Sequence, residues 1–170
     1  MIEGIAAAGP QGAGVIQDFA RSELFDRTFN EGMELVEETA AYLDGGGRQE
    51  SKLLSRNAAL AYASESMRLT TRLMQVASWL LVQRAVREGD MAPEVAFEDR
   101  YRLNAADVCR AELAEGAEEL PSGLLGLLDR SARLYERVRH LDQRMYLDAA
   151  DPDNAVLSQF DRLRSAYGGA

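Results

Sequence analysis

The sequence is poor in the residues that most often carry chemistry. Its 170 residues include one cysteine, Cys109, and one histidine, His140. A single cysteine excludes an internal disulfide and gives no metal-ligand spacing, and a single histidine leaves most metal sites and histidine-based catalysis without a second partner. We therefore expect no enzyme, no metal and no cofactor. No nearby histidine activates Cys109, so its thiol should be neutral, and His140 should lie at the surface or its boundary.

Long apolar runs are also missing. No stretch approaches the roughly 18 residues that a membrane-spanning helix needs, and the opening Met1-Ile2-Glu3-Gly4 lacks the basic region of a secretory signal. A composition of 46% hydrophobic and 28% charged residues excludes wholesale disorder. The chain is long enough for one domain with a real core. We expect a soluble, cytoplasmic protein.

Positive charge is scarce overall but unevenly placed. The net charge is −9, which repels nucleic acid at long range. Residues 18–44 carry eight acids against two arginines, whereas residues 51–88 carry one lysine and five arginines against two acids. We expect the acidic and basic segments to pack together.

Glycine and proline mark the domain boundaries. Residues 1–17 hold four glycines and a proline with little periodicity, and we interpret them as a flexible arm. Their glycines lack the lysine ending of a phosphate loop. The sequence Asp151-Pro152-Asp153 breaks structure near the other end, so the predicted helical bundle domain is 18–148 and 149–170 form a mobile tail.

The first predicted helix spans residues 22–44, with Ser22 as N-cap. Its apolar residues recur at steps of three and four, as one stripe requires: Phe25, Phe29, Met33, Val36, Ala40 and Leu43. Gly45 to Gly47 should end it through a left-handed backbone. An anion cradle over 45–48 is the less favoured reading of these glycines.

The second predicted helix, residues 51–88, is long and carries two apolar stripes. Leu69, Leu73, Val76 and Leu80 form one, which we assign to the core of the subunit. The other predicts a homodimer interface, because two stripes need two packing partners: Met67, Met74, Ala77, Leu81 and Ala85. The alternative is one wide core in a monomer. We interpret Met67 and Met74 as core filler rather than as a binding groove.

A third sector of this helix combines arginine with tryptophan, a composition typical of binding hot spots. It holds Arg68, Arg72, Gln75, Trp79 and Val86. The sequence favours a structural role, in which the arginines pair with Glu34, Glu37 or Glu38 and Trp79 caps the edge of the core. Arg68, Arg72 and Trp79 remain our candidate partner-binding residues.

The rest of the chain yields two helices and two looser segments. Pro93 favours a short helix over 93–100, although Ala92 is not the capping residue expected there. Residues 102–120 form a loose acidic connection. A third long helix over 121–147 has a coiled-coil-like seam: Leu127, Ser131, Leu134, Val138, Leu141 and Met145. In the tail, Leu157, Phe160 and Leu163 are further candidates for binding a partner.

Two long strings carry a family resemblance. EGMELVEETAAYLDGGGR (31–48) and ESMRLTTRLMQVASWLLVQRAVREGDM (65–91) resemble the alphaproteobacterial RcdA family, the regulators of CtrA degradation. The resemblance implies an up-down three-helix bundle that dimerises. It also implies an adaptor that helps deliver substrates to the ClpXP protease during the cell cycle. The implied partners are CpdR-like and PopA-like factors and cargo such as the transcription factor CtrA, with recruitment to a cell pole.

The residues alone leave other functions open. The arginines of 51–88 could serve a small DNA-associated regulator. The acids Glu31, Glu34 and Glu38 could serve a ligand-binding bundle, although metal-binding carboxylate bundles pair Glu-x-x-His motifs, which this chain lacks. A purely structural scaffold dimer is not distinguished from an adaptor by sequence.

Overall fold

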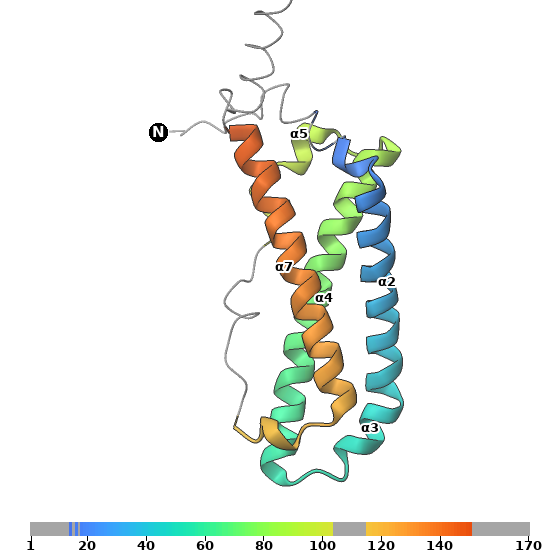
Figure 1. The fold of residues 1–170 in the computed structure, drawn as a ribbon, viewed down its shortest axis with the longest axis vertical. Coiled ribbons are helices and arrows are strands. Elements are labelled where there is room, and N and C mark those ends of the chain that lie inside the picture. Colours follow the sequence, from blue (N-terminus) through green and yellow to red (C-terminus); the bar gives the residue numbers. More distant parts are fainter. Residues whose placement is uncertain (1–13, 15, 17, 104–114, 151–170) are drawn as a thin grey trace, which may run out of the picture.

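Three long helices lie side by side in the computed structural model (Figure 1), as the sequence predicts. They are α2 (Glu23–Asp44), α4 (Arg56–Glu88) and α7 (Ser122–Ala150). The structure describes residues 14, 16, 18–103 and 115–150, except for the side chains of 146–150, and these residues contain no strand. The all-α fold class is therefore confirmed.

The short elements close the two ends of the bundle. At one end lie α3 (Gly46–Ser51) and the 3-10 turn η2 (Ala117–Glu119). At the other lie α5 (Pro93–Ala96) and the 3-10 turn η1 (Asp99–Tyr101) (Figure 1). Most of the predicted arm and tail falls outside the described residues. Ile16, which we placed in the arm, is buried in the core.

The contacts between helices fix their directions. Ser55 bonds to Glu119 near the start of α4, and Trp79 bonds to Asp142 near its end, so α4 and α7 run parallel. In contrast, α2 runs antiparallel to both, since Arg130 pairs with Glu38. The bundle thus departs from strict up-down alternation. A parallel pair needs a long return connection, and residues 89–121 supply it.

α2 begins as predicted, but its buried face is rotated. The Ser22 hydroxyl accepts a hydrogen bond from the Phe25 backbone N–H at 3.2 Å, which makes Ser22 the N-cap. The fully buried residues are Phe25, Thr28, Gly32, Leu35 and Thr39. Of the predicted stripe only Phe25 is fully buried, and Ala40 is exposed. Small residues hold the centre of this face because α4 packs closely there: a Cβ on Gly32 would lie 2.7 Å from Leu80 Cδ1.

The predicted boundary after α2 is wrong in detail. Gly45 ends the helix with φ −109°, which is not the left-handed backbone we expected, and Gly46 and Gly47 enter α3. α4 consequently starts at Arg56 rather than near residue 51. The Ser55 hydroxyl caps it by accepting from the Ala58 N–H at 3.3 Å. Gly89, with φ 82°, supplies a left-handed end to α4.

The ring of Tyr42 locks this end of the bundle. A Cβ on Gly47 would lie 2.6 Å from one edge of the ring and a Cβ on Gly123 would lie 2.6 Å from the other. The Tyr42 hydroxyl donates to Glu50 Oε2 at 2.8 Å. Burial and then the Glu50 carboxylate raise the pKa of Tyr42, so its hydroxyl stays protonated at neutral pH. The glycines are there because the ring occupies their side-chain space.

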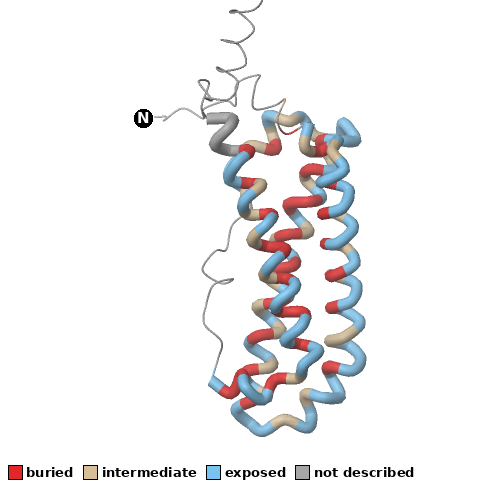
Figure 2. The backbone as a smooth tube through the Cα atoms, in the orientation of Figure 1, coloured by how far each residue is buried: buried red, intermediate tan, exposed pale blue. Residues whose placement is uncertain are grey.

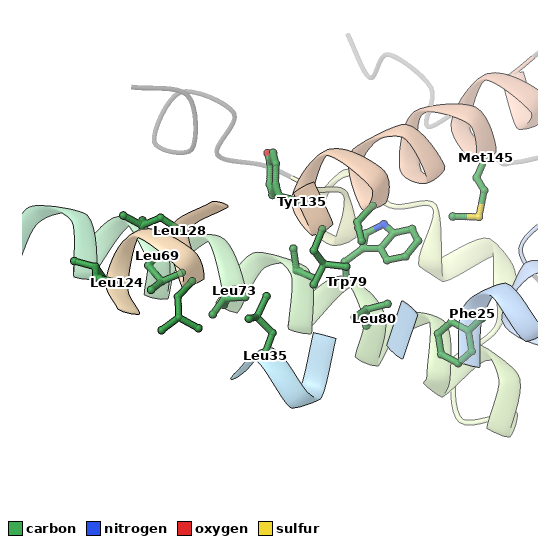
Figure 3. Packing of buried hydrophobic residues seen from close by; sticks show 14 of the residues in the cluster. Phe25, Leu35, Leu69, Leu73, Trp79, Leu80, Leu124, Leu128, Tyr135 and Met145 are labelled. Carbon is green, nitrogen blue, oxygen red and sulfur yellow. The ribbon is translucent and has the colours of Figure 1, made fainter. Parts of the chain in front are cut away.

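The core stripe of α4 is confirmed. Leu69, Leu73, Val76 and Leu80 are all buried. Figure 2 shows buried residues recurring along the long helices where they face one another. The core stripe of α4 packs against Leu35 of α2 and against leucines of α7 such as Leu124 and Leu128 (Figure 3). On α7 the predicted seam is buried apart from the half-buried Leu141. His140 is exposed, as expected.

The short helix after Pro93 is shorter than predicted. α5 ends at Ala96, and η1 covers Asp99 to Tyr101. No side-chain hydrogen bond caps α5, consistent with alanine at position 92. Cys109 and most of the acidic connection lie outside the described residues. No described helix has both the length and the apolar character to span a membrane.

Candidate interaction surfaces

Arg72 is buried between α4 and α7 rather than displayed. Its Nη1 donates to the Leu128 carbonyl at 3.1 Å and to Ser131 Oγ at 2.7 Å. Arg68 pairs with the buried Glu65 of its own helix at 3.0 Å. The expected pairing of these arginines with Glu34, Glu37 or Glu38 is therefore wrong. Both guanidinium groups are engaged in the fold, and neither adds to an exposed basic face.

Trp79 is also buried, and it bonds across the same interface. Its Nε1 donates to Asp142 Oδ1 at 3.0 Å, while Arg102 Nη2 lies 3.7 Å from Asp142 Oδ2. Burial raises the pKa of the Asp142 carboxyl, and the Trp79 and Arg102 contacts partly offset that rise. Trp79 therefore belongs to the core and not to its edge. The described fold gives a partner no access to Arg72 or Trp79.

The carboxylates of α2 face the arginines of α7. Arg130 Nη1 contacts both oxygens of Glu38, at 2.8 and 2.7 Å, and Arg137 pairs with Glu31. Asp26 of α2 also pairs with Arg87 of α4. The acidic first helix therefore forms ion pairs with both neighbours, and it packs more extensively against α4, as predicted, than against α7. Within the described ranges, no group of three or more His, Cys, Asp or Glu is placed to hold a metal ion.

One apolar row on α4 stays open to solvent. Leu60, Met67, Met74 and Leu81 recur every seven residues and are 65%, 72%, 61% and 51% exposed. Met67 and Met74 are therefore not core filler. Small residues lie on the same face about one helical turn after the large ones: the half-buried Ala77 follows Met74, and the half-buried Ala85 follows Leu81. We call this face the α4 seam, and alternating large and small residues suit close packing against another helix.

A groove beside the α4 seam extends the apolar surface onto α2. It has a volume of about 440 Å³ and is largely apolar; its lining is Val36, Thr39, Ala40, Leu43, Asp44, Thr70, Leu73, Met74 and Ala77. Met74 and Ala77 belong to both features. An occupant of the α4 seam would therefore also contact α2.

The exposed face of α7 carries a second row, which is basic. Arg130, Arg133, Arg137, His140 and Arg144 follow at steps of three and four, and all are exposed. We call it the basic row. A shallow hollow of about 660 Å³ lies over Arg130, Arg133, Arg137, Glu31 and Glu136. The spacing of three and four is visible in the sequence, although the sequence-based candidates were arginines of α4 and not of α7.

The tail candidates Leu157, Phe160 and Leu163 lie outside the described residues. The sequence analysis assigned Val36, Ala40 and Leu43 to the core-facing stripe of the first helix, and so it did not predict that they border a groove. The groove becomes visible only once α2 and α4 are placed side by side.

The fold and its surfaces define an all-helical bundle protein with an open apolar seam and an exposed basic row. Residues 16–167 match the family described as "Protein of unknown function (DUF1465)". Among solved structures, the crystal structure of RcdA from Caulobacter crescentus CB15 is 71% identical, with a TM-score of 0.63; the match covers 77% of this chain and 98% of that one. The chain belongs to the RcdA family. No curated protein matches it.

Proposed function

We propose that this chain is a non-enzymatic adaptor that regulates CtrA degradation by helping to deliver cell-cycle regulators to the ClpXP protease. The observation that carries the proposal is the 71% identity to RcdA over nearly the whole of that protein. The partners that follow are CpdR-like and PopA-like factors and cargo such as CtrA. The proposed place of action is the cytoplasm, with recruitment to a cell pole.

An adaptor acts by holding two proteins at once, which raises their effective concentration for each other. This requires exposed surfaces on a rigid body and no reactive pocket. Two separate surfaces support the proposal: the α4 seam and the basic row lie on different helices, so two partners can be bound without competing for one helix.

Self-association is part of the proposal. The α4 seam exposes four large apolar side chains at heptad spacing, on a helix whose opposite face is fully buried. The exposed fractions of Met67 and Met74 are too large for a monomeric core, and their spacing fits a second copy of the same helix. The proposed dimer interface consists of Met67, Met74, Ala77, Leu81 and Ala85. It would present every other surface in duplicate.

A reconstituted degradation assay tests the adaptor function. Purified ClpXP, a CpdR-like factor, a PopA-like factor and CtrA are combined with and without this chain, and the half-life of CtrA is measured. RcdA from Caulobacter crescentus serves as the positive control. We expect a shorter half-life with this chain, approaching that with RcdA. An unchanged half-life, with the control active, would refute the proposal.

A further inference from the structure

The basic row already forms ion pairs with one helix of the same chain, α2. Glu31 and Glu38 of α2 are seven residues apart, and they pair with Arg137 and Arg130, which are also seven apart on the antiparallel α7. Nη1 of Arg130 donates to both carboxylate oxygens of Glu38, a charge-assisted contact of the kind that makes arginine a good partner for a carboxylate. The edge of the row formed by Arg130 and Arg137 thus binds carboxylates that are seven residues apart on a helix.

No other helix of the described part of the chain forms ion pairs with the other edge of the row. At about 100° per residue, Arg144 and Arg133 lie roughly 40° and 60° around α7 from Arg130. The buried Leu134 and Val138 lie on the opposite side of Arg130. Among the residues that the structure describes, Arg133 forms an ion pair within its own helix, with Asp129 at 2.7 Å. Arg144 forms no ion pair within residues 18–103 and 115–145, whose side chains the structure describes.

We propose that the outer edge of the basic row, Arg133, His140 and Arg144, binds an acidic helix of a partner protein. The partner would present carboxylates at the spacing with which α2 already meets the row. The inference rests on the proposed function, since it assigns one of the adaptor's two surfaces. From Arg130 to Arg144 the row is roughly 21 Å long, at 1.5 Å rise per residue, or about four turns of a helix.

The charges favour an acidic protein over nucleic acid. The net charge of the chain is −9, and exposed carboxylates, Glu34 and Glu37, lie on the neighbouring α2. A continuous phosphate backbone would approach this negative surface throughout. A helix with spaced carboxylates would meet one guanidinium at a time, as α2 does.

Breaking the ion pair at the outer edge should also cost little folding free energy. The side chains of Arg133 and Asp129 are 76% and 58% exposed, and exposed ion pairs of this kind contribute little to stability. Exchanging Asp129 for a partner's carboxylate therefore leaves the fold intact. Binding should be weak, fast and sensitive to salt, as handover of cargo requires.

Fluorescence anisotropy with a labelled peptide tests this directly, without protease or cargo. The probe is a synthetic helix of 21 residues with glutamates at positions i, i+7 and i+11, compared with the same peptide carrying glutamines. The variant is Arg133→Gln with Arg144→Gln. Its matched control, Arg27→Gln with Arg48→Gln, removes the same charge from exposed arginines on α2 and α3. Circular dichroism confirms that each variant is folded.

We expect the glutamate peptide to bind the wild type and the control, and to bind the Arg133/Arg144 variant about tenfold more weakly, as the loss of two exposed ion pairs implies. Binding should weaken as salt rises. Equal binding to the variant, or no preference for glutamate over glutamine, would overturn the proposal. Tighter binding of a DNA duplex than of the peptide at equal salt would overturn it as well. Delivery of CtrA is measured in a separate assay. The adaptor function and the binding site on α7 can therefore be refuted independently.

Discussion

Trp79 Nε1 donates a hydrogen bond of 3.0 Å to Asp142 Oδ1, and this bond joins α4 to α7 where both side chains are buried. Arg102, from the connection that follows η1, approaches the other oxygen of the same carboxylate. The buried Asp142 carboxylate thus links α4 and α7 to the segment after η1 that contains Arg102. Its environment makes its charge state matter for stability.

Asp142→Ala and Asp142→Asn separate the hydrogen bond from the charge. Alanine leaves the buried Trp79 N–H without an acceptor and should lower the free energy of unfolding by about 1–3 kcal/mol. Asparagine keeps an oxygen for Trp79 and removes a charge that burial disfavours, so we expect a change of less than about 1 kcal/mol at pH 7. Urea denaturation measures both. Equal losses would mean that the hydrogen bond is unimportant.

The pH dependence of Asp142 follows from its raised pKa. Because the pKa in the folded state lies above the unfolded value, protonation favours the folded state. This contribution is fully present below the unfolded pKa and is lost as pH rises through the folded pKa. As pH falls from about 7 to about 4, the free energy of unfolding of the wild type should therefore increase relative to that of Asp142→Asn. A constant difference between the two would contradict the raised pKa.

Gly47→Ala and Gly123→Ala should each destabilise the protein by about 1–3 kcal/mol. Either Cβ would lie 2.6 Å from a Tyr42 ring carbon, and overpacking in a confined site costs about that much. Gly126→Ala is the matched control on α7, because nothing lies within 4 Å of its Cβ. It should stabilise the helix by about 0.5–1 kcal/mol. Thermal unfolding distinguishes the two signs, and stabilisation by all three changes would exclude the Tyr42 lock.

Arg72→Met should destabilise the fold by about 1–3 kcal/mol. The substitution removes the donors to the Leu128 carbonyl and Ser131 Oγ, while the apolar chain keeps much of the buried volume. Glu38→Gln is the contrasting change: the side chains of Arg130 and Glu38 are about half exposed, so its loss should be below about 1 kcal/mol and smaller in high salt. If Arg72→Met did not change the free energy of unfolding, the structural role of Arg72 would be refuted, and a role in binding a partner would be favoured instead.

Met67→Glu with Met74→Glu should abolish self-association. Both side chains are exposed in the single subunit, so glutamate is tolerated by the monomer fold but would be buried unpaired in a dimer. Leu24→Glu, at a residue 48% exposed on α2, is the control. Light scattering at micromolar concentration should give twice the subunit mass for wild type and control, and one subunit mass for the double variant. A wild-type monomer would remove the proposed interface.

The sequence predicts the helices well where periodicity and caps agree. Ser22 and the stripe of Leu69, Leu73, Val76 and Leu80 are found as expected, since each depends on local chemistry or on spacing along one helix. What depends on the separation of helices is less predictable. The burial of Gly32 in place of Met33, and the entry of Gly46 and Gly47 into α3, follow from the close approach of Leu80 and the position of the Tyr42 ring.

The candidate sites were harder to predict than the fold. The presence of arginine and tryptophan on one face of α4 does not reveal that Ser131 and Asp142 of α7 lie opposite them. Side chains typical of binding hot spots are equally suited to polar contacts in a core. The second apolar stripe of α4 was predictable from its spacing. Its exposure was not, because a wide monomer core was an open alternative, and only the positions of α2 and α7 leave Met67 and Met74 facing solvent.

The half-life of CtrA in Caulobacter crescentus cells that lack RcdA and produce this chain tests the central proposal most directly. If this chain is an adaptor for regulated proteolysis, the half-life of CtrA should return to that of cells with their own RcdA. The Met67/Met74 and Arg133/Arg144 variants, made in the same cells, show whether either surface is required. If CtrA remains as long-lived with this chain as without it, at equal protein levels, the adaptor account is wrong.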